Sequence, residues 1–363
     1  MRNGDESAGQ AMPAGGTAAA LPIEFRGKAT EYFGIWIVNL ALTVITIGVF
    51  SAWAKVRRKR YFLGNTYIDG HAFDYHAKGK QLLIGRVLVV AVLVGQSFIE
   101  EISPFVAFGT LLVIIFVLLP WVINRSLSFN ARMTSWRNVR FNFRPSFWGA
   151  LGTMILMPAV GVLTLGLLMP VATGMGANYI VRRHSFGTAS FDSNPSLGDY
   201  YLAGLQAVGA GIVVLVVLYP IAHFGTMLMI PEVDPTDMQL VGLLAGNLLP
   251  ILIAIAVLIV IEFYGALSRK IIVNAIALSG GHRFRATITG TEYTWIRVSN
   301  AIVQTVTLFL MRPWAAVRDW RYNCNHIKVL PAGDLGGFVD SARPAGGAFG
   351  SEYVDVVGFD FGL

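Results

Sequence analysis

Long apolar runs separated by polar, basic segments form the main pattern along this chain. The four plainest runs occupy residues 82–99, 104–124, 199–222 and 239–265. Each can supply the roughly 20 residues that one membrane-spanning helix needs. Three more runs lie at residues 33–53, 146–172 and 293–311. The pattern predicts an all-α polytopic membrane protein with about seven apolar segments.

The segment at 146–181 is too long for one span and too interrupted for a straight helix. Proline and glycine disfavour an unbroken helix, and broken backbone at membrane depth persists only inside protein or beside water. The segment is therefore either a kinked ordinary span or a re-entrant element that enters and leaves on one side. The two other short runs could bend in the same way, the first near residues 46–48. The interruptions are Pro158, Gly161, Gly166, Pro170, Gly174 and Gly176.

The distribution of basic residues favours the re-entrant arrangement. The loops at 54–81 and 125–145 hold seven and five Lys or Arg residues. Seven ordinary crossings would put the basic-free segment 223–238 on the same side as these loops, which fits the positive-inside rule poorly. A re-entrant segment places all the strongly basic loops in the cytoplasm. It leaves outside two acidic turns, which contain Glu100, Glu101, Glu232, Asp234 and Asp237.

Short stretches of alternating polar and apolar residues occur within the basic segments. They lie at residues 65–76, 184–191 and 282–290. Period-two alternation is typical of strands, and Asp69-Gly70 is a turn signal within the first stretch. We therefore expect small β-like cytoplasmic insertions, which could pair into a small sheet.

One stretch of the chain occurs twice. Residues 31–61 align with residues 292–322 without a gap, and 11 of the 31 aligned positions are identical. A fainter copy follows the first at an offset of 118 residues. These matches predict internal repeats, about two and a half copies, with boundaries near 23–124, 141–265 and 284–330. Together they make a membrane domain at 23–330, between a disordered N-terminal tail at 1–22 and a flexible C-terminal tail at 331–363.

The first copy also carries a family resemblance. It reads EYFGIWIVNLALTVITIGVFSAWAKVRRKRYFLGNTYIDGHAFDY. Its asparagine and its Thr-x-Gly, Trp-Ala-Lys-Val-Arg and Asn-Thr elements resemble the YjgN family of bacterial inner-membrane proteins, whose function is unknown. The similarity extends over roughly residues 23–330. It implies a multipass protein of the bacterial inner (plasma) membrane, and it supplies no activity or catalytic residues.

Composition agrees with a membrane location. Charged residues make up 13% of the chain and its mean hydropathy is +0.60, whereas a soluble domain carries about a quarter charged residues. The net charge of +7 suggests a cytoplasmic face that meets anionic lipids rather than nucleic acid. The single cysteine, Cys324, excludes an internal disulfide framework and a cysteine-built metal site. We expect membrane lipids, mainly anionic, as partners.

The repeated phrase keeps one face of a helix. One interpretation is a membrane-boundary anchor, with interfacial aromatic rings and snorkelling arginines. A second is packing between the copies, with Trp53 stacked on Arg57. A third is a paired site for an anionic ligand, on which four arginines converge. The candidate residues are Trp53, Arg57, Arg60 and Tyr61 in the first copy and Trp314, Arg318, Arg321 and Tyr322 in the last.

Three polar residues inside or beside apolar runs are further candidates. Asn39 and Asn300 recur at matching positions, and such amides either form helix–helix hydrogen bonds or coordinate a ligand. Glu262 ends an apolar run near Arg269. An interfacial ion pair between these two residues and a proton relay through Glu262 are the two alternatives.

Catalytic signatures are missing from the sequence. It contains no Walker A motif, no nucleophile elbow and no helical zinc motif. We therefore predict no catalytic residue, cofactor or metal, and an enzyme is not favoured. A transporter or channel-like protein is the first functional hypothesis, and a non-catalytic membrane scaffold or anionic-lipid-binding protein is the alternative.

Overall fold

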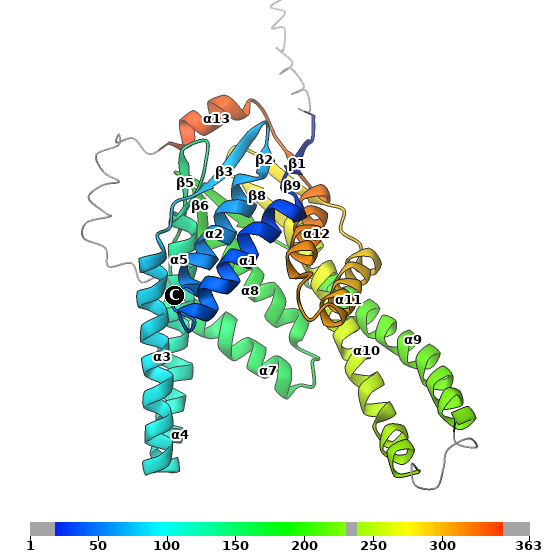
Figure 1. Ribbon diagram of the computed structural model, residues 1–363. Coiled ribbons are helices and arrows are strands. Elements are labelled where there is room, and N and C mark those ends of the chain that lie inside the picture. Colours follow the sequence, from blue (N-terminus) through cyan, green and yellow to red (C-terminus); the bar gives the residue numbers. More distant parts are fainter. Residues whose placement is uncertain (1–18, 230–237, 344–363) are drawn as a thin grey trace, which may run out of the picture.

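A closed barrel of antiparallel strands forms one end of the protein, and helices extend away from it (Figure 1). The computed structural model describes residues 19–229 and 238–343. Around the barrel the strands follow the order β1-β10-β9-β8-β7-β6-β5-β4-β3-β2. Neighbours in the barrel are thus neighbours along the chain, except where β10 pairs with β1 and closes the barrel.

Most of the strands form short hairpins. The first joins β2 (Thr66–Ile68) to β3 (His71–Tyr75). Asp69 and Gly70 connect them with φ angles of 51° and 71°, the left-handed geometry of a tight hairpin turn, so the predicted turn is confirmed. The other strands are β1 (Leu21–Phe25), β4 (Thr134–Trp136), β5 (Val139–Phe143), β6 (His184–Phe186), β7 (Ala189–Ser193), β8 (Ile276–Leu278), β9 (His282–Ala286) and β10 (Ile327–Leu330).

Aromatic side chains fill the barrel. Four phenylalanines each occupy the central position of a five-residue strand and pack against the apolar core of the barrel: Phe73, Phe141, Phe191 and Phe284. Successive rings in this series lie 6.4 Å apart between centroids. Helix α13 (Leu335–Ala342) covers one end of the barrel (Figure 1) and contributes to the same core.

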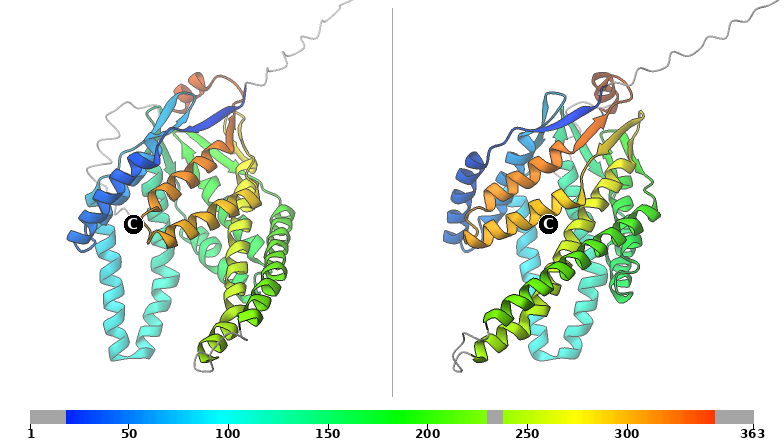
Figure 2. Two further views of the ribbon diagram at one scale, coloured as in Figure 1. Left: turned by 45° about the vertical axis from the view of Figure 1, so that its right-hand side comes forward. Right: turned by 90° about the vertical axis from the view of Figure 1, so that its right-hand side faces the viewer.

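Two long helical pairs hang from the barrel on different sides (Figure 2). Four helical stretches in the described residues are long and apolar enough to cross a membrane: Gly79–Ile102, Pro104–Arg132, Leu197–Gly225 and Leu248–Ala275. They coincide with the four plainest apolar runs. The helices of these pairs are α3 (Gly79–Ile102), α4 (Pro104–Val113), the π-helical η1 (Ile114–Leu118), α5 (Leu119–Arg132), α9 (Leu197–Met229) and α10 (Met238–Ala275).

The three remaining apolar runs form short bent pairs of helices. Each descends from the barrel, turns sharply and returns to it. The helices are α1 (Ala29–Ile45) with α2 (Ser51–Gly64), then α6 (Phe147–Ala150), the π-helical η2 (Leu151–Leu156) and α7 (Met157–Leu163) with α8 (Met169–Arg183), and α11 (Gly290–Val306) with α12 (Arg312–Asn325).

The helical pairs pack side by side around the barrel axis. The second helix of each pair contacts the first helix of the next, in the sequence α2 with α3, α5 with α6, α8 with α9 and α10 with α11. Contact between α12 and α1 completes the ring. At this junction the rings of Phe62 and Trp320 contact each other at a tilt, with 5.1 Å between their centroids. The first and last copies of the repeated phrase are therefore neighbours.

The prediction of an all-α protein with about seven apolar segments is wrong. The stretches expected as small β-like insertions belong to one closed ten-stranded barrel, and the described residues contain four long apolar helices. The strands were underestimated because each has only three to five residues. Their pairing joins segments that long helices separate, which a local pattern does not reveal.

Some predictions fall on other parts of the chain. Most of the expected N-terminal tail, the acidic residues Glu232, Asp234 and Asp237, and residues 344–363 of the expected C-terminal tail lie outside the described residues. Residues 335–342 of that tail form α13 and pack on the barrel.

Candidate functional site

The three short pairs turn with the same local geometry. Thr46 donates its hydroxyl to the carbonyl of Leu42 at 2.7 Å and accepts the N–H of Phe50 at 2.9 Å. Thr164 and Thr307 make the equivalent pair of hydrogen bonds in the second and third turns. The residue after each threonine has a left-handed backbone: Ile47 at φ 48°, Leu165 at 52° and Leu308 at 47°.

Each turn also satisfies its own backbone N–H groups. In the first turn every N–H from Thr46 to Ser51 finds an acceptor within the turn or the helix before it. The side chains of Ile47, Leu165 and Leu308 are 94%, 98% and 83% exposed. Apolar tips with satisfied N–H groups suit a medium that cannot supply hydrogen bonds.

A tyrosine from the second helix of each pair holds the start of the first helix. The hydroxyl of Tyr61 accepts the N–H of Lys28, the residue that caps α1, at 2.7 Å. The hydroxyls of Tyr179 and Tyr322 accept the N–H groups of the equivalent residues Ser146 and Thr289, both at 3.3 Å. These contacts satisfy a backbone donor that has no partner inside the helix. Tyr61 and Tyr322 therefore have a structural role, which is to stabilise the start of a helix.

The recurring asparagines and arginines contact each other within the first and last pairs. Nη1 of Arg57 donates to Oδ1 of Asn39 at 3.3 Å. Nη1 of Arg318 donates to Oδ1 of Asn300 at 3.0 Å and to the hydroxyl of Ser299 at 2.7 Å. The asparagines therefore join the two helices of one pair.

Arg60 and Arg321 reach backbone carbonyls of the neighbouring unit. Arg60 donates from Nη2 to the carbonyl of Ala77 at 2.8 Å and from Nε to that of Tyr75 at 3.1 Å. Arg321 donates from Nη2 to the carbonyl of Gly27 at 2.9 Å. Ala77 and Gly27 are both the second residue after a strand. Each arginine thus holds the strand-to-helix link of the next unit.

The two tryptophans occupy different surroundings. The Trp53 ring lies against the backbone of Gly79, where a Cβ atom would collide with it. Arg57 lies over the ring of Phe50, 5.3 Å from its centroid, rather than on Trp53 as the stacking hypothesis expected. In the last pair Arg318 does lie over Trp314, at 5.2 Å.

An open groove of about 480 Å³ lies between α1 and α2. Arg57, Arg60 and Tyr61 line one side of it, and Gly34, Ile35 and Val38 line the other. Three of the residues singled out in the sequence therefore share one site. We call this site the α1–α2 groove.

The other candidates are not part of this groove. Trp314, Arg318, Arg321 and Tyr322 lie on α12, and none of them lines it. Sequence reasoning missed Gly34, Ile35 and Val38, although Val38 follows Ile35 by three residues and Gly34 by four, a spacing that places these residues on one side of a helix. The signal was hidden because most of their neighbours in α1 are also apolar.

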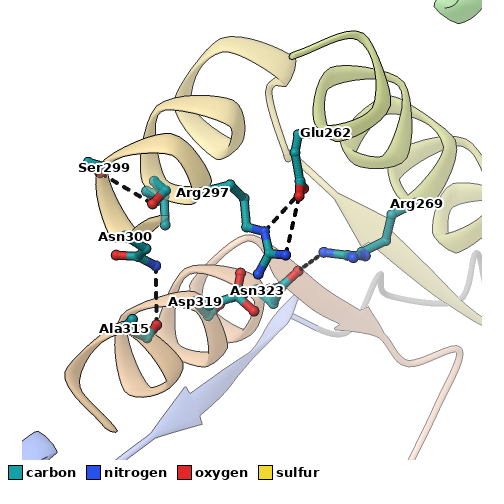
Figure 3. Close-up of polar contacts among 9 residues, drawn as sticks. Glu262, Arg269, Arg297, Ser299, Asn300, Ala315, Asp319 and Asn323 are labelled. Atoms are coloured by element: carbon teal, nitrogen blue, oxygen red, sulfur yellow. Dashed lines mark hydrogen bonds and ion pairs between the residues drawn. The ribbon is translucent and has the colours of Figure 1, made fainter. Parts of the chain in front are cut away.

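A second polar cluster joins α10, α11 and α12 (Figure 3). Glu262 accepts two hydrogen bonds from Arg297, at 3.1 and 3.2 Å. Arg269 instead donates to Asn323 at 2.5 Å. The expected pair of Glu262 with Arg269 is therefore wrong: a residue on a different helix supplies the partner, because the ring packing brings α11 against α10.

The candidate site contains no obvious catalytic chemistry. Among the residues that the structure describes, no group of three or more His, Cys, Asp or Glu side chains could hold a metal ion. The surface of the groove is almost entirely apolar, and the residues that line it include Arg57, Arg60 and Tyr61.

Fold and site together define a class: a multipass membrane protein with a strand barrel on one side and long and short helical pairs on the other. The chain belongs to the family described as "Bacterial protein of unknown function (DUF898)", which matches residues 20–356. No solved structure matches this chain.

Relatives bear the name that the resemblance suggested. "Inner membrane protein YjgN" of Salmonella typhimurium is 27% identical over 337 residues, which cover 81% of this chain and 84% of that protein. The proteins of the same name from Escherichia coli O157:H7 and K12 are 30% identical over 155 residues, 42% of this chain and 38% of theirs. With the four long apolar helices, these relatives identify the chain as a bacterial inner-membrane protein.

Proposed function

We propose that this inner-membrane protein binds an anionic phospholipid in the α1–α2 groove. The observation that supports the proposal is the lining of the groove: two arginines and a tyrosine belong to an open groove whose surface is mainly apolar. A phospholipid presents the same two chemistries, a phosphate and an acyl chain, within one molecule. The role that follows is that of a non-catalytic, lipid-binding membrane protein.

Unused donors on Arg57 support the phosphate end of this proposal. A guanidinium has five N–H donors, and in the described structure the Arg57 side chain uses Nη1 on Asn39. Arg60 uses Nε and Nη2 on carbonyls, which leaves Nη1. Both side chains are exposed, so a phosphate can approach them without disturbing the contacts within the protein.

The apolar end is supported by α1. Ile35 and Val38 line the groove, and the helix continues to its tip with exposed apolar side chains, including Val44 and Ile45. An acyl chain laid along this helix covers apolar surface at a gain of about 25 cal/mol per Å² in water, and less where other lipid already covers it.

The test measures lipid that stays with the purified full chain. We expect Arg57→Gln to lower the amount of phosphatidylglycerol that co-purifies in neutral detergent, as quantified by mass spectrometry of extracted lipid. The same variant should lose its preference for phosphatidylglycerol over phosphatidylcholine in mixed nanodiscs. Arg58→Gln is the matched control, since Arg58 is an exposed arginine on the same helix that does not line the groove.

A second control separates charge from structure. Asn39→Leu breaks the same Arg57–Asn39 hydrogen bond but keeps the Arg57 charge, so it should retain lipid. Equal lipid retention in Arg57→Gln and Arg58→Gln would overturn the proposal.

The short helical pairs bear on how the protein sits in its membrane. We propose that all three enter the membrane from the barrel side and return, while the two long pairs cross it. Their exposed apolar tips and satisfied backbone N–H groups support this arrangement. The barrel, with the basic segments, then lies in the cytoplasm.

We also propose that the chain is made of internal repeats. Support comes from contacts that recur at fixed spacing: the tyrosine contact joins residues 33 apart in all three short pairs, and the Arg–Asn contact joins residues 18 apart in two of them. These spacings suggest a unit of one strand hairpin and one helical pair, smaller than the unit predicted from the sequence.

Transport is the second candidate function. The three short helical pairs favour a transport function, because discontinuous helices form the substrate sites of many transporters. Solute flux into proteoliposomes that is abolished in the double variant Asn39→Leu with Asn300→Leu would support this function. A folded protein that moves none of a broad panel of solutes would count against it.

A further inference from the structure

The face of α2 opposite the groove carries a separate cluster of cations. Lys55 and Lys59 are one helical turn apart, and at 100° per residue they point away from Arg57. Lys55 and Lys59 are half-buried, and so is Arg86 of the adjacent helix α3. We call these three residues the inner basic cluster.

Neutral polar groups surround the inner basic cluster. Lys59 donates to Oδ1 of Asn130 on α5, and its Nζ lies 5.1 Å from the centre of the Tyr75 ring. Arg86 donates to the hydroxyl of Ser51 at the start of α2. The cluster therefore lies between α2, α3, α5 and β3.

No carboxylate balances these charges within the described residues. None of the ion pairs there includes Lys55, Lys59 or Arg86. Burial and, to a smaller extent, the nearby charge of Lys55 together lower the pKa of Lys59 to about 8. Burial and the charge of Arg86 likewise lower the pKa of Lys55.

Holding three cations together in a half-buried place without a counterion is unfavourable. An anion beside Lys55, which lies between Ser51 and Lys59 on the same face of α2, would offset the repulsion and accept from donors of the cluster. A phosphate group has several acceptor oxygens and a double negative charge, so it matches three donors better than a single carboxylate does.

We infer that Lys55, Lys59 and Arg86 form a binding site for a phosphate group, either as the free anion or as a phosphomonoester headgroup. The site lies on the other face of α2 from the α1–α2 groove. None of its three residues lines that groove, so the inference does not rest on the lipid binding proposed above.

The test follows thermal unfolding of the full chain in neutral maltoside micelles. Inorganic phosphate is titrated against chloride at constant ionic strength. We expect phosphate to raise the unfolding temperature of the unaltered chain by about 2–4 °C, the shift that roughly 1 kcal/mol of binding produces in a chain of a few hundred residues.

The variants Lys55→Gln and Lys59→Gln distinguish a phosphate-binding site from a purely structural role of these lysines. Each removes one member of a repelling group, so each should raise the unfolding temperature in phosphate-free buffer and abolish the phosphate-dependent rise. Arg58→Gln, on the same helix but outside the cluster, should keep that rise. A purely structural role for Lys55 would lower the unfolding temperature instead.

A second arm separates the two sources of the phosphate group. Micelles doped with phosphatidic acid replace free phosphate in the same titration. Stabilisation by free phosphate points to a soluble anion, and stabilisation by phosphatidic acid alone points to a headgroup; both support the inference. No stabilisation in either arm, or an undiminished effect in Lys55→Gln and Lys59→Gln, overturns it. Lipid retention in Arg57→Gln is a separate measurement, so the two proposals can fail independently.

Discussion

Nη1 of Arg318 lies 3.0 Å from Oδ1 of Asn300, and the two residues join the two helices of the last short pair. Arg57 and Asn39 make the same contact, at 3.3 Å, in the first pair. The matching asparagines and arginines of the sequence are therefore the two ends of one hydrogen bond. The hydrogen bond between the two helices explains why both residues recur, and this explanation requires no ligand.

The two asparagines should not be equally important for stability. Asn300 is 3% exposed and also donates to the carbonyl of Ala315 at 3.2 Å. We expect Asn300→Leu to destabilise the protein by about 2 kcal/mol, because it leaves a half-buried arginine and a buried carbonyl with fewer partners. Asn39→Leu should cost about 1 kcal/mol, since Arg57 is exposed to solvent or headgroups. Thermal unfolding in detergent measures both, and a larger loss for Asn39→Leu would contradict this ranking.

The sequence was sufficient for the membrane part of the fold. Long apolar runs have one stable solution in a bilayer, so the four plainest runs became the four long helices. The bend at Thr46-Ile47-Gly48 could also be predicted from the sequence, since Gly48 adopts a φ of 86° that glycine allows. The same bend occurs at Leu308-Phe309, which has no glycine, so composition alone would have missed it.

The barrel and the groove depend on relations that a local pattern does not contain. A strand such as Thr66–Ile68 has three residues, too few for alternation to be distinctive. The partners of β1 include β10, about 300 residues away. Likewise Glu262 forms its ion pair with Arg297 rather than with Arg269, because the partner of a charged side chain depends on which helices pack together. The arginines were correctly noticed, but their hydrogen bonds to carbonyls such as Ala77 depend on the ring of helical pairs.

The tyrosine contacts offer a direct comparison between the three short pairs. We expect Tyr61→Phe, Tyr179→Phe and Tyr322→Phe each to destabilise the protein, by about 0.5–1.5 kcal/mol, because each leaves one N–H at a helix start without its partner. Tyr179→Phe should cost the most, since its hydroxyl is also hydrogen-bonded to buried Asn124. Unfolding temperatures of the three variants check the order. A neutral Tyr179→Phe would show that the hydroxyl is dispensable.

Single-cysteine labelling should place the barrel and the helical tips. In a Cys324→Ser background, we expect a cysteine at Glu101 to react with an impermeant maleimide in intact cells. A cysteine at Ser190, exposed on β7, should react only after permeabilisation. A cysteine at Leu165 should react poorly in both conditions, because the proposed re-entrant tip lies in the hydrocarbon.

The same experiment has an internal control. Cys324 is buried and burial raises the pKa of its thiol to about 11, so the unaltered chain should label weakly until it is denatured. Labelling of the Leu165 position from outside intact cells would mean that this pair crosses the membrane.

Acidification should loosen α13 from the barrel. His282 is 3% exposed, its ring lies 4.3 Å from that of Phe338 on α13, and its Nδ1 accepts the N–H of Ala332 at 3.2 Å. Burial lowers the pKa of His282 below its ordinary value of 6.5. The folded protein therefore holds a neutral imidazole, and the undocked state binds a proton more readily. The docking free energy is fully present above pH 6.5 and falls as the pH drops towards the lowered pKa.

Hydrogen exchange of residues 335–342 at pH 7 and pH 5 measures this effect. We expect faster exchange at pH 5, because a protonated Nδ1 becomes a donor and can no longer accept from Ala332. His282→Asn keeps an acceptor but removes the titration, so exchange in that variant should depend less on pH after correction for the intrinsic rate. His71→Gln is the control, since His71 occupies the same first position of its strand but is exposed. If His71→Gln removed the pH dependence and His282→Asn did not, the imidazole of His282 would not be the group that responds.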